Sequence, residues 1–189
     1  FARFVQPDAA SATLNRVVSG LPSSVLGSLE ANGRVFLINP NGILIGAGAR
    51  IDTGGFLAST LDVANQDFLA GGDLRFSGDS AAAVQNLGAI NALGGDVFLI
   101  ARRVENAGTI SAAGGTVGLA AGSEVLLTTG GSERVFVQTG SAPGALTNAG
   151  TITATTVADA SWYGTYHLAV NHGCLLCRSG RGGLKFGTY

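Results

Sequence analysis

The feature that most constrains this chain is a sequence repeat with a period of about twenty residues. Three segments begin with Asn-x-Gly, and their first asparagines are 20 and then 42 residues apart, so one degenerate unit separates the last two. Short apolar runs and glycine corners at a fixed period, without helical periodicity, predict an all-β solenoid. The repeated residues are Asn86, Asn106 and Asn148, followed by Ile90, Ile110 and Ile152.

Residues at the same repeat position stack on one another in a solenoid, about 4.8 Å apart. We therefore expect the side-chain amides of Asn86, Asn106 and Asn148 to form a hydrogen-bonded ladder at the corners, as stacked amides do in other cross-strand arrays. Ile90, Ile110 and Ile152 should form an aliphatic column inside. About seven coils would give a solenoid about 35 Å long.

A second informative stretch is Asn39-Pro40-Asn41-Gly42-Ile43. Two short apolar runs, Val35–Ile38 and Ile43–Ile45, flank the first four of these residues. Asn side chains bond to nearby backbone, Pro fixes φ, and Gly tolerates positive φ, so the four residues predict a tight corner between two strands.

The region from Ala58 to Gln85 departs from the repeat. It carries most of a group of five acidic residues that lie between Asp52 and Asp79. We expect a solvated excursion in this region, with a β-hairpin outside the solenoid.

Composition excludes several classes of protein. The chain has 189 residues, 46% of them hydrophobic, with 30 Gly and 12% charged residues, which is enough apolar material for a folded domain. A net charge of −1 without a basic cluster gives no reason to expect a nucleic-acid partner. No apolar stretch approaches the roughly 20 residues of a membrane span. A first residue of Phe1 and the absence of Met indicate an interior fragment, with the N-terminal part of the domain incomplete.

Nothing in the repeat predicts catalysis. Its acidic residues occur singly on different inferred coils, whereas β-helical lyases and hydrolases need clustered carboxylates. These residues are Asp52, Asp96, Glu105 and Glu124, and the paired bases are Arg102 and Arg103. We predict no enzyme, no catalytic residues and no cofactor.

Residues 158–189 differ in composition from the rest. They contain both Cys, both His, the single Trp and all three Tyr. We interpret them as an atypical, disordered tail that does not continue the repeat of residues 1–157. His172, Cys174 and Cys177, with His167 nearby, could begin a zinc site, but a lone C-x-x-C is a weak signal, and we predict no metal.

Several segments resemble one known family, and they are spread over residues 1–157. They are Phe4-Val5-Gln6-Pro7-Asp8, Leu14–Gly20, Leu26–Leu29, Ala31–Ile43 and Ala58–Val63. Together they resemble the haemagglutination-activity, or two-partner secretion, domain of filamentous-haemagglutinin-like exoproteins. The resemblance implies a right-handed, single-stranded parallel β-helix near the amino end of a large secreted protein. It also implies recognition by the POTRA domains of a dedicated outer-membrane transporter.

The sequence therefore predicts a secretion-targeting module of a large bacterial exoprotein or adhesin, which reaches the cell surface or the medium through the periplasm. Its expected partner is the outer-membrane transporter, with host or cell-surface receptors bound through downstream regions. Two alternatives remain open, the export domain of a cytolysin or contact-dependent toxin and a β-helical carbohydrate-active enzyme. The candidate recognition site is Asn39, Pro40, Asn41, Gly42 and Ile43, unless these residues only form the corner.

Overall fold

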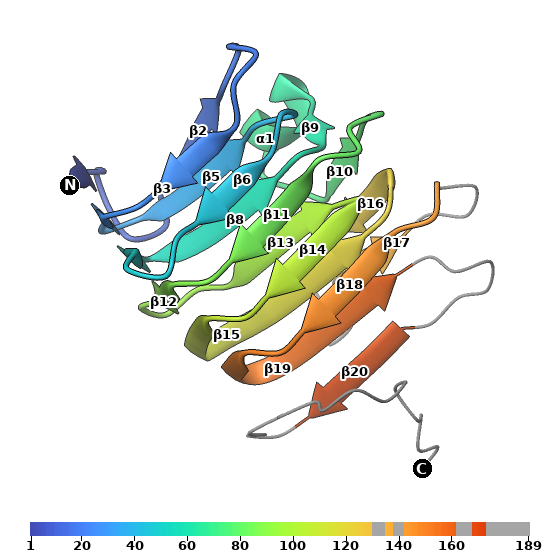
Figure 1. Ribbon diagram of the computed structural model, residues 1–189. Coiled ribbons are helices and arrows are strands. Elements are labelled where there is room, and N and C mark those ends of the chain that lie inside the picture. The colour runs from blue at the N-terminus through green and yellow to red at the C-terminus, as the bar shows by residue number, and fades with distance from the viewer. Residues whose placement is uncertain (130–134, 138–141, 162–167, 173–189) are drawn as a thin grey trace.

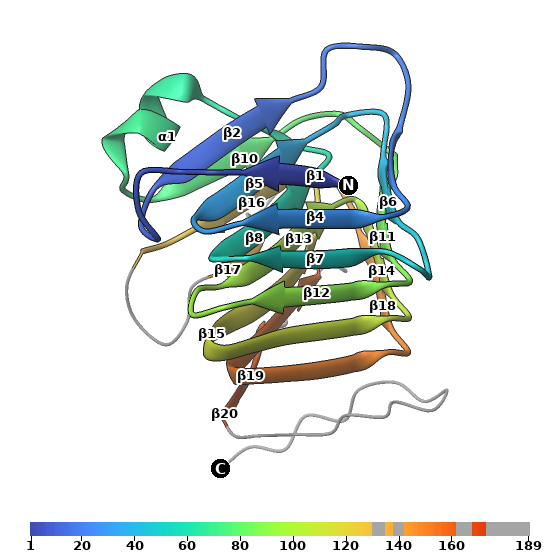
Figure 2. The same cartoon turned by 90° about the vertical axis from the view of Figure 1, so that its left-hand side faces the viewer.

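The chain winds as a right-handed parallel β-helix with three faces (Figures 1 and 2). The computed structural model describes residues 1–129, 135–137, 142–161 and 168–172. In Figure 2 the strands of one face cross the front, the chain then passes behind them, and each circuit ends one level lower. This winding confirms the predicted β-solenoid.

Each face is a stack of short parallel strands. The first face contains β1 (Ala2–Phe4), β4 (Ser28–Ala31), β7 (Arg50–Thr53), β12 (Ala89–Ala92) and the starts of β15 (Thr109–Ala121) and β19 (Thr151–Ser161). The second contains β2 (Ala12–Arg16), β5 (Arg34–Ile38), β8 (Gly55–Ser59), β13 (Val97–Ala101) and the ends of β15 and β19. The third contains β3 (Ser23–Val25), β6 (Ile43–Ile45), β11 (Ala83–Asn86), β14 (Arg103–Asn106) and β18 (Ala145–Asn148).

Each coil contributes one strand segment to the first face, and the described residues contain six such segments. The repeat spacing predicts about seven coils. β15 and β19 each serve two faces, because both bend at the register shift between Ala112 and Thr116. The short strands and the glycines between them allow a circuit of only about twenty residues.

The interior of the β-helix is a column of aliphatic side chains. Ile51 pairs with Ile90, Ile90 with Ile110, and Ile110 with Ile152. All four are at most 3% exposed, which confirms the predicted internal stacking of the last three. Burying one such side chain contributes about 1.5–3 kcal/mol relative to leaving it exposed, so each coil adds stability by covering the coil before it.

The region from Ala58 to Gln85 contains the predicted hairpin, but it is not a simply solvated excursion. β9 (Asp62–Val63) and β10 (Leu74–Ser77) pair antiparallel. A short helix that the sequence analysis missed, α1 (Asn65–Ala70), lies between them and ends at Gly71, whose φ is 68°. Two later strands, β16 (Glu124–Leu127) and β17 (Val135–Val137), complete a four-stranded sheet in the order β17-β16-β10-β9.

This extra-helical sheet covers the outside of the second face and creates a second apolar core. Outward-facing Phe36, Ile38, Leu57, Phe98 and Ile100 pack with Leu61, Val63, Phe76 and Val125. Phe76 and Leu61 have no exposed surface. Burial of these apolar residues is favourable, so the region from Ala58 to Gln85 folds back onto the β-helix with its charged residues facing outward.

Arg16 ties the first coil to the extra-helical elements. Its Nε donates to Asp62 Oδ1 at 2.8 Å, its Nη1 to Asn65 Oδ1 at 3.0 Å, and its Nη2 to the Val63 carbonyl at 2.8 Å. One guanidinium thus fixes the place where the chain leaves the solenoid.

At the C-terminal end, β19 crosses residue 157 and stays in register with β15 to Ser161, and β20 (Leu168–His172) pairs antiparallel with β19. Disorder was predicted for residues 158–189, and most of these residues lie outside the described ranges. His167, Cys174 and Cys177 also lie outside them. Within the described residues no helix is long and apolar enough to cross a membrane.

Candidate functional site

The segment Asn39-Pro40-Asn41-Gly42 forms the corner between β5 on the second face and β6 on the third. The Gly42 N–H donates to the Asn39 carbonyl at 3.1 Å and closes the turn. Gly42 has φ of 112°, in the region that a glycine enters without steric cost. Ile43 follows as the first residue of β6 and is 2% exposed.

Asn39 joins this corner to the coil before it. Its side chain has no exposed surface, and its Nδ2 donates to the Leu21 carbonyl at 3.0 Å and to Ser23 Oγ at 2.8 Å. Its Oδ1 accepts from the N–H of Asn41 at 2.9 Å. Because both ends of the amide are satisfied inside the protein, Asn39 is a structural residue.

Pro40 and Asn41 face outward. The Asn41 Nδ2 donates to the Ser19 carbonyl at 2.8 Å, which holds the exposed amide against the preceding coil. The Pro40 carbonyl accepts from Ser80 Oγ. The motif therefore divides into a buried part that shapes the corner and an exposed part that a partner can reach.

The exposed part lies beside apolar residues of the first coil. Val18 is 93% exposed and Leu21 is 71% exposed, and both belong to the link between β2 and β3 that the corner asparagines hold. We call Val18, Leu21, Pro40 and Asn41 the corner surface. Among the described residues β2 and β3 each pair on one side only, so two open strand edges adjoin this surface.

The repeated asparagines lie at a different corner, between the third and first faces. Asn86 Nδ2 donates to Asn106 Oδ1 at 2.8 Å, and Asn106 Nδ2 donates to Asn148 Oδ1 at 2.8 Å. The first two asparagines are at most 1% exposed. The structure brings the three side chains into one row and keeps them apart from the corner surface.

The glycine of each Asn-x-Gly unit is required by the close stacking of the corners. The Gly88 N–H donates to Asn86 Oδ1 and the Gly150 N–H to Asn148 Oδ1, both at 3.2 Å. The corners stack so closely that a Cβ on Gly108 would lie 2.1 Å from the Gly88 carbonyl oxygen, much closer than atoms can approach.

Gln6 forms a buried hydrogen-bond network that the sequence did not predict. Gln6, 8% exposed, donates through Nε2 to the Arg34 carbonyl at 2.8 Å and accepts the Gly33 N–H through Oε1 at 2.8 Å. Asn32 exchanges two further bonds with the Gln6 backbone. The only sequence signal was a Gln before Pro7 inside the family-like segment, and a single Gln does not predict burial.

Each of the four acids singled out from the sequence has its own partners: three pair with arginines, and the Asp96 carboxylate accepts the N–H of Thr116 at 2.8 Å. The three pairs are Arg50 with Asp52, Arg75 with Glu124 and Arg103 with Glu105. Asp52 also accepts from Asn91 Nδ2, and Glu105 from Gln85 Nε2. Within the described part of the chain no three His, Cys, Asp or Glu side chains gather in a metal-binding group.

Comparison with known proteins gives the same family as the sequence motifs. The family model of the TPS secretion domain matches residues 1–171. The crystal structure of the HMW1 secretion domain from Haemophilus influenzae superposes with a TM-score of 0.67 at 35% identity, over 83% of this chain and 45% of that chain.

Two sequences named heme/hemopexin-binding protein, both from Haemophilus influenzae, are 50% identical over 60 residues and 46% identical over 61 residues. Each match covers 32% of this chain and 7% of the relative. The matched family and the matched structure are secretion domains rather than enzymes. The chain therefore belongs to the TPS secretion-domain family and is a secretion-targeting module of a two-partner secretion exoprotein.

Proposed function

We propose that the POTRA domains of an outer-membrane two-partner secretion transporter recognise this domain through the corner surface, while the exoprotein passes through the periplasm. The observation that carries the proposal is the division of the Asn39–Ile43 motif. Asn39, Gly42 and Ile43 are buried, whereas Pro40 and Asn41 are exposed. Corner formation accounts for the buried residues but does not require exposed apolar neighbours beside the corner.

The open strand edges suggest the mode of binding. An extended segment of the partner can pair with an unpaired strand edge, where backbone hydrogen bonds supply affinity and side-chain contacts supply selectivity. β2 and β3 offer such edges, and the link between them carries Val18 and Leu21. Contact with these two side chains would fix the register of the added strand.

The test is the affinity of the folded domain for purified transporter POTRA domains. Val18→Ser removes an apolar contact worth about 1.5 kcal/mol or more, so we expect roughly tenfold weaker binding. Asn41→Ala removes an exposed amide and should also weaken binding. Leu87→Ser is the matched control, because Leu87 is 44% exposed at the corner that leads from β11 to β12. Circular dichroism checks that each variant retains its β content.

Asn39→Ala separates folding from recognition. It leaves the Leu21 carbonyl and Ser23 Oγ without their buried donor, and it should lower the free energy of unfolding by about 2–3 kcal/mol. Affinity measured on the fraction that is folded should change little. If folded Val18→Ser and Asn41→Ala bind POTRA domains as tightly as the wild type, the corner surface is not the recognition site and Asn41 serves only the corner.

A further inference from the structure

The chain contains two Asn-Gly pairs, Asn32-Gly33 and Asn41-Gly42. Asparagine is a chemically labile residue, and a following glycine makes it more reactive, because the glycine nitrogen is unhindered and its backbone rotates freely. Both asparagines are exposed. The reaction needs the asparagine amide and the glycine N–H to leave their hydrogen bonds, so the fold decides which pair reacts.

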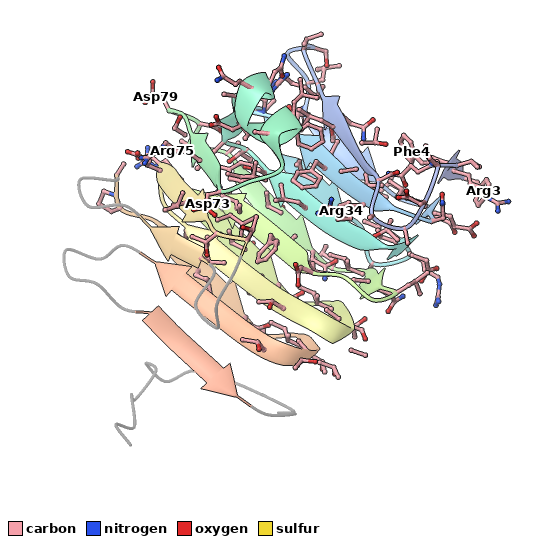
Figure 3. The ribbon with its side chains drawn as sticks, turned by 180° about the vertical axis from the view of Figure 1, so that it is seen from behind. Arg3, Phe4, Arg34, Asp73, Arg75 and Asp79 are labelled. Atoms are coloured by element: carbon pink, nitrogen blue, oxygen red, sulfur yellow. The ribbon has the colours of Figure 1, made fainter. Side chains whose placement is uncertain are left out.

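The two pairs flank one strand. The first directly precedes Arg34, where β5 begins, and the second follows Pro40, in the corner after β5 ends. Figure 3 labels Arg34 and Asp79, and Ser80, next to Asp79, donates to the Pro40 carbonyl. Because both pairs lie in the same molecule, each serves as the control for the other.

Asn32-Gly33 is held tightly. Asn32 Oδ1 accepts the Gln6 N–H at 2.7 Å, and Asn32 Nδ2 donates to the Gln6 carbonyl at 2.8 Å. The Gly33 N–H donates to Gln6 Oε1 at 2.8 Å. A Cβ on Gly33 would lie 2.5 Å from the Ser11 carbonyl oxygen. Both ends of the Asn32 amide are therefore fixed, and Gly33 has no room to rotate.

Asn41-Gly42 is held less tightly. Asn41 Nδ2 donates to the Ser19 carbonyl at 2.8 Å and to Asn39 Oδ1 at 3.2 Å, but no described residue donates to Asn41 Oδ1. The Gly42 N–H reaches the Asn39 carbonyl at 3.1 Å. A Cβ on Gly42 would meet nothing nearer than 3.5 Å. The Asn41 amide can thus turn toward the Gly42 nitrogen at lower cost.

We propose that Asn41 is a site of spontaneous covalent modification in the folded domain, by deamidation through a succinimide. The Gly42 nitrogen bonds to Asn41 Cγ, the Cγ–Nδ2 bond breaks, and Nδ2 leaves as ammonia with the proton of the Gly42 N–H. Water then opens the ring at one of its two carbonyls and gives aspartate or isoaspartate. The proposal concerns the chemistry of this chain alone and does not depend on transporter recognition.

The modification changes the contact between the corner and the first coil. The amide that donates to the Ser19 carbonyl at 2.8 Å becomes a carboxylate, which cannot donate. Two acceptors then face each other, and the corner surface gains a negative charge. The product should therefore release the corner from the link between β2 and β3.

The test is incubation of the folded full chain in mildly alkaline buffer, followed by trypsin digestion and tandem mass spectrometry. Cleavage after arginine places the two pairs in separate peptides, residues 17–34 and 35–50. Asn39 does not confuse the second peptide, because Pro40 has no N–H to form the ring. The same incubation in urea measures both pairs without the protection of the fold.

In the folded chain Asn41 should deamidate at least about fivefold faster than Asn32, whose Oδ1 must also leave the Gln6 N–H. In urea the two rates should be similar. Asn32 reacting as fast as Asn41 in the folded chain overturns the proposal. So does an Asn41 that stays intact in the folded chain while both pairs react in urea, because the fold then protects both.

Gln6→Ala checks the origin of the difference. It frees the Gly33 N–H and should speed Asn32 deamidation about fivefold, while the Asn41 rate stays unchanged. Thermal unfolding confirms that the variant is folded. An unchanged Asn32 rate in the folded variant would contradict the protection argued from the Gln6 contacts.

Asn41→Asp reproduces one product and tests its consequence. Two N–H groups join the link to the chain on either side of the corner, Val17 to the Ile38 carbonyl at 2.8 Å and Ser23 to the Gly42 carbonyl at 2.9 Å. Hydrogen exchange of both should be at least about fivefold faster than in the wild type. Unchanged exchange would show that the charge does not release the corner.

Discussion

The asparagine ladder gives the most quantitative prediction, and Asn106 is its central member. Asn106→Ala removes the bond that Asn106 accepts from Asn86 and the bond that it donates to Asn148. It also leaves Asn86 Nδ2 with only its long bond to the Thr109 carbonyl at 3.4 Å, whereas Asn148 Oδ1 keeps the Gly150 N–H. Two lost bonds at about 1 kcal/mol each, with about 1 kcal/mol for the poorly paired Asn86 donor, give a loss of about 3 kcal/mol.

Asn148→Ala is the internal comparison, because it changes the same residue type at the same repeat position. Asn148 is half-buried at the end of the row, and its replacement breaks one ladder bond instead of two. We expect a loss of about 2 kcal/mol. The double variant should lose less than the sum by about 1–2 kcal/mol, since the two residues share one bond.

Equilibrium urea denaturation followed by far-UV circular dichroism measures these free energies of unfolding. Hydrogen exchange should localise the damage to β14 and β18, because a coil contacts mainly its neighbours. The ladder does not stabilise the fold in this way if Asn106→Ala costs about 1 kcal/mol or less, if Asn148→Ala costs as much as Asn106→Ala, or if the two losses simply add.

Three further predictions follow from single contacts. Thr53→Val should raise the melting temperature measured by calorimetry by a few degrees. The Thr53 hydroxyl is buried without a partner, and an isosteric methyl group removes that cost of about 1 kcal/mol. A lower melting temperature would contradict this prediction. Gly108→Ala should leave little soluble folded protein on size-exclusion chromatography, because its Cβ would lie 2.1 Å from the Gly88 carbonyl oxygen; a normally folded variant would show that the corner can shift. Hydrogen bonds from the Ser11 hydroxyl and N–H lower the pKa of Asp8 below its ordinary 3.8. The stability that ionised Asp8 provides is therefore present above pH 3.8 and is lost as the pH falls through the lowered pKa. NMR titration should show the lowered pKa of Asp8, and Asp8→Asn should abolish that part of the pH dependence of stability.

The fold suits a secretion domain for a simple physical reason. Each coil of the β-helix lies on the one before it, and the apolar residues of one circuit are covered by the next. A chain of this kind can gain stability in small steps along its length. The open strand edges of the first coil and the corner surface lie at the N-terminal end of this stack (Figure 2), so a partner at that end does not interrupt the stacking.

The sequence was most informative where one residue repeats at one position. Asn86, Asn106 and Asn148 predicted a ladder, and the isoleucines predicted an inner column, because stacking makes equal sequence positions into spatial neighbours. It was least informative in the region from Ala58 to Gln85. The acidic residues there suggested a solvated hairpin, yet Leu61 and Phe76 are fully buried. Their cover includes β16, which follows β10 only after two further circuits, and no local pattern reveals such a partner.

The corner motif shows the same division within five residues. Its residue types alone determined that the chain turns between two strands, because Pro, Asn and Gly restrict the backbone locally. Which of its side chains are available to a partner was decided only by the tertiary structure. Asn39 is buried because the preceding coil places the Leu21 carbonyl and Ser23 Oγ against its amide, whereas Pro40 and Asn41 remain exposed. The period fixed the solenoid, but contacts between coils and with the extra-helical sheet decided which surfaces face water.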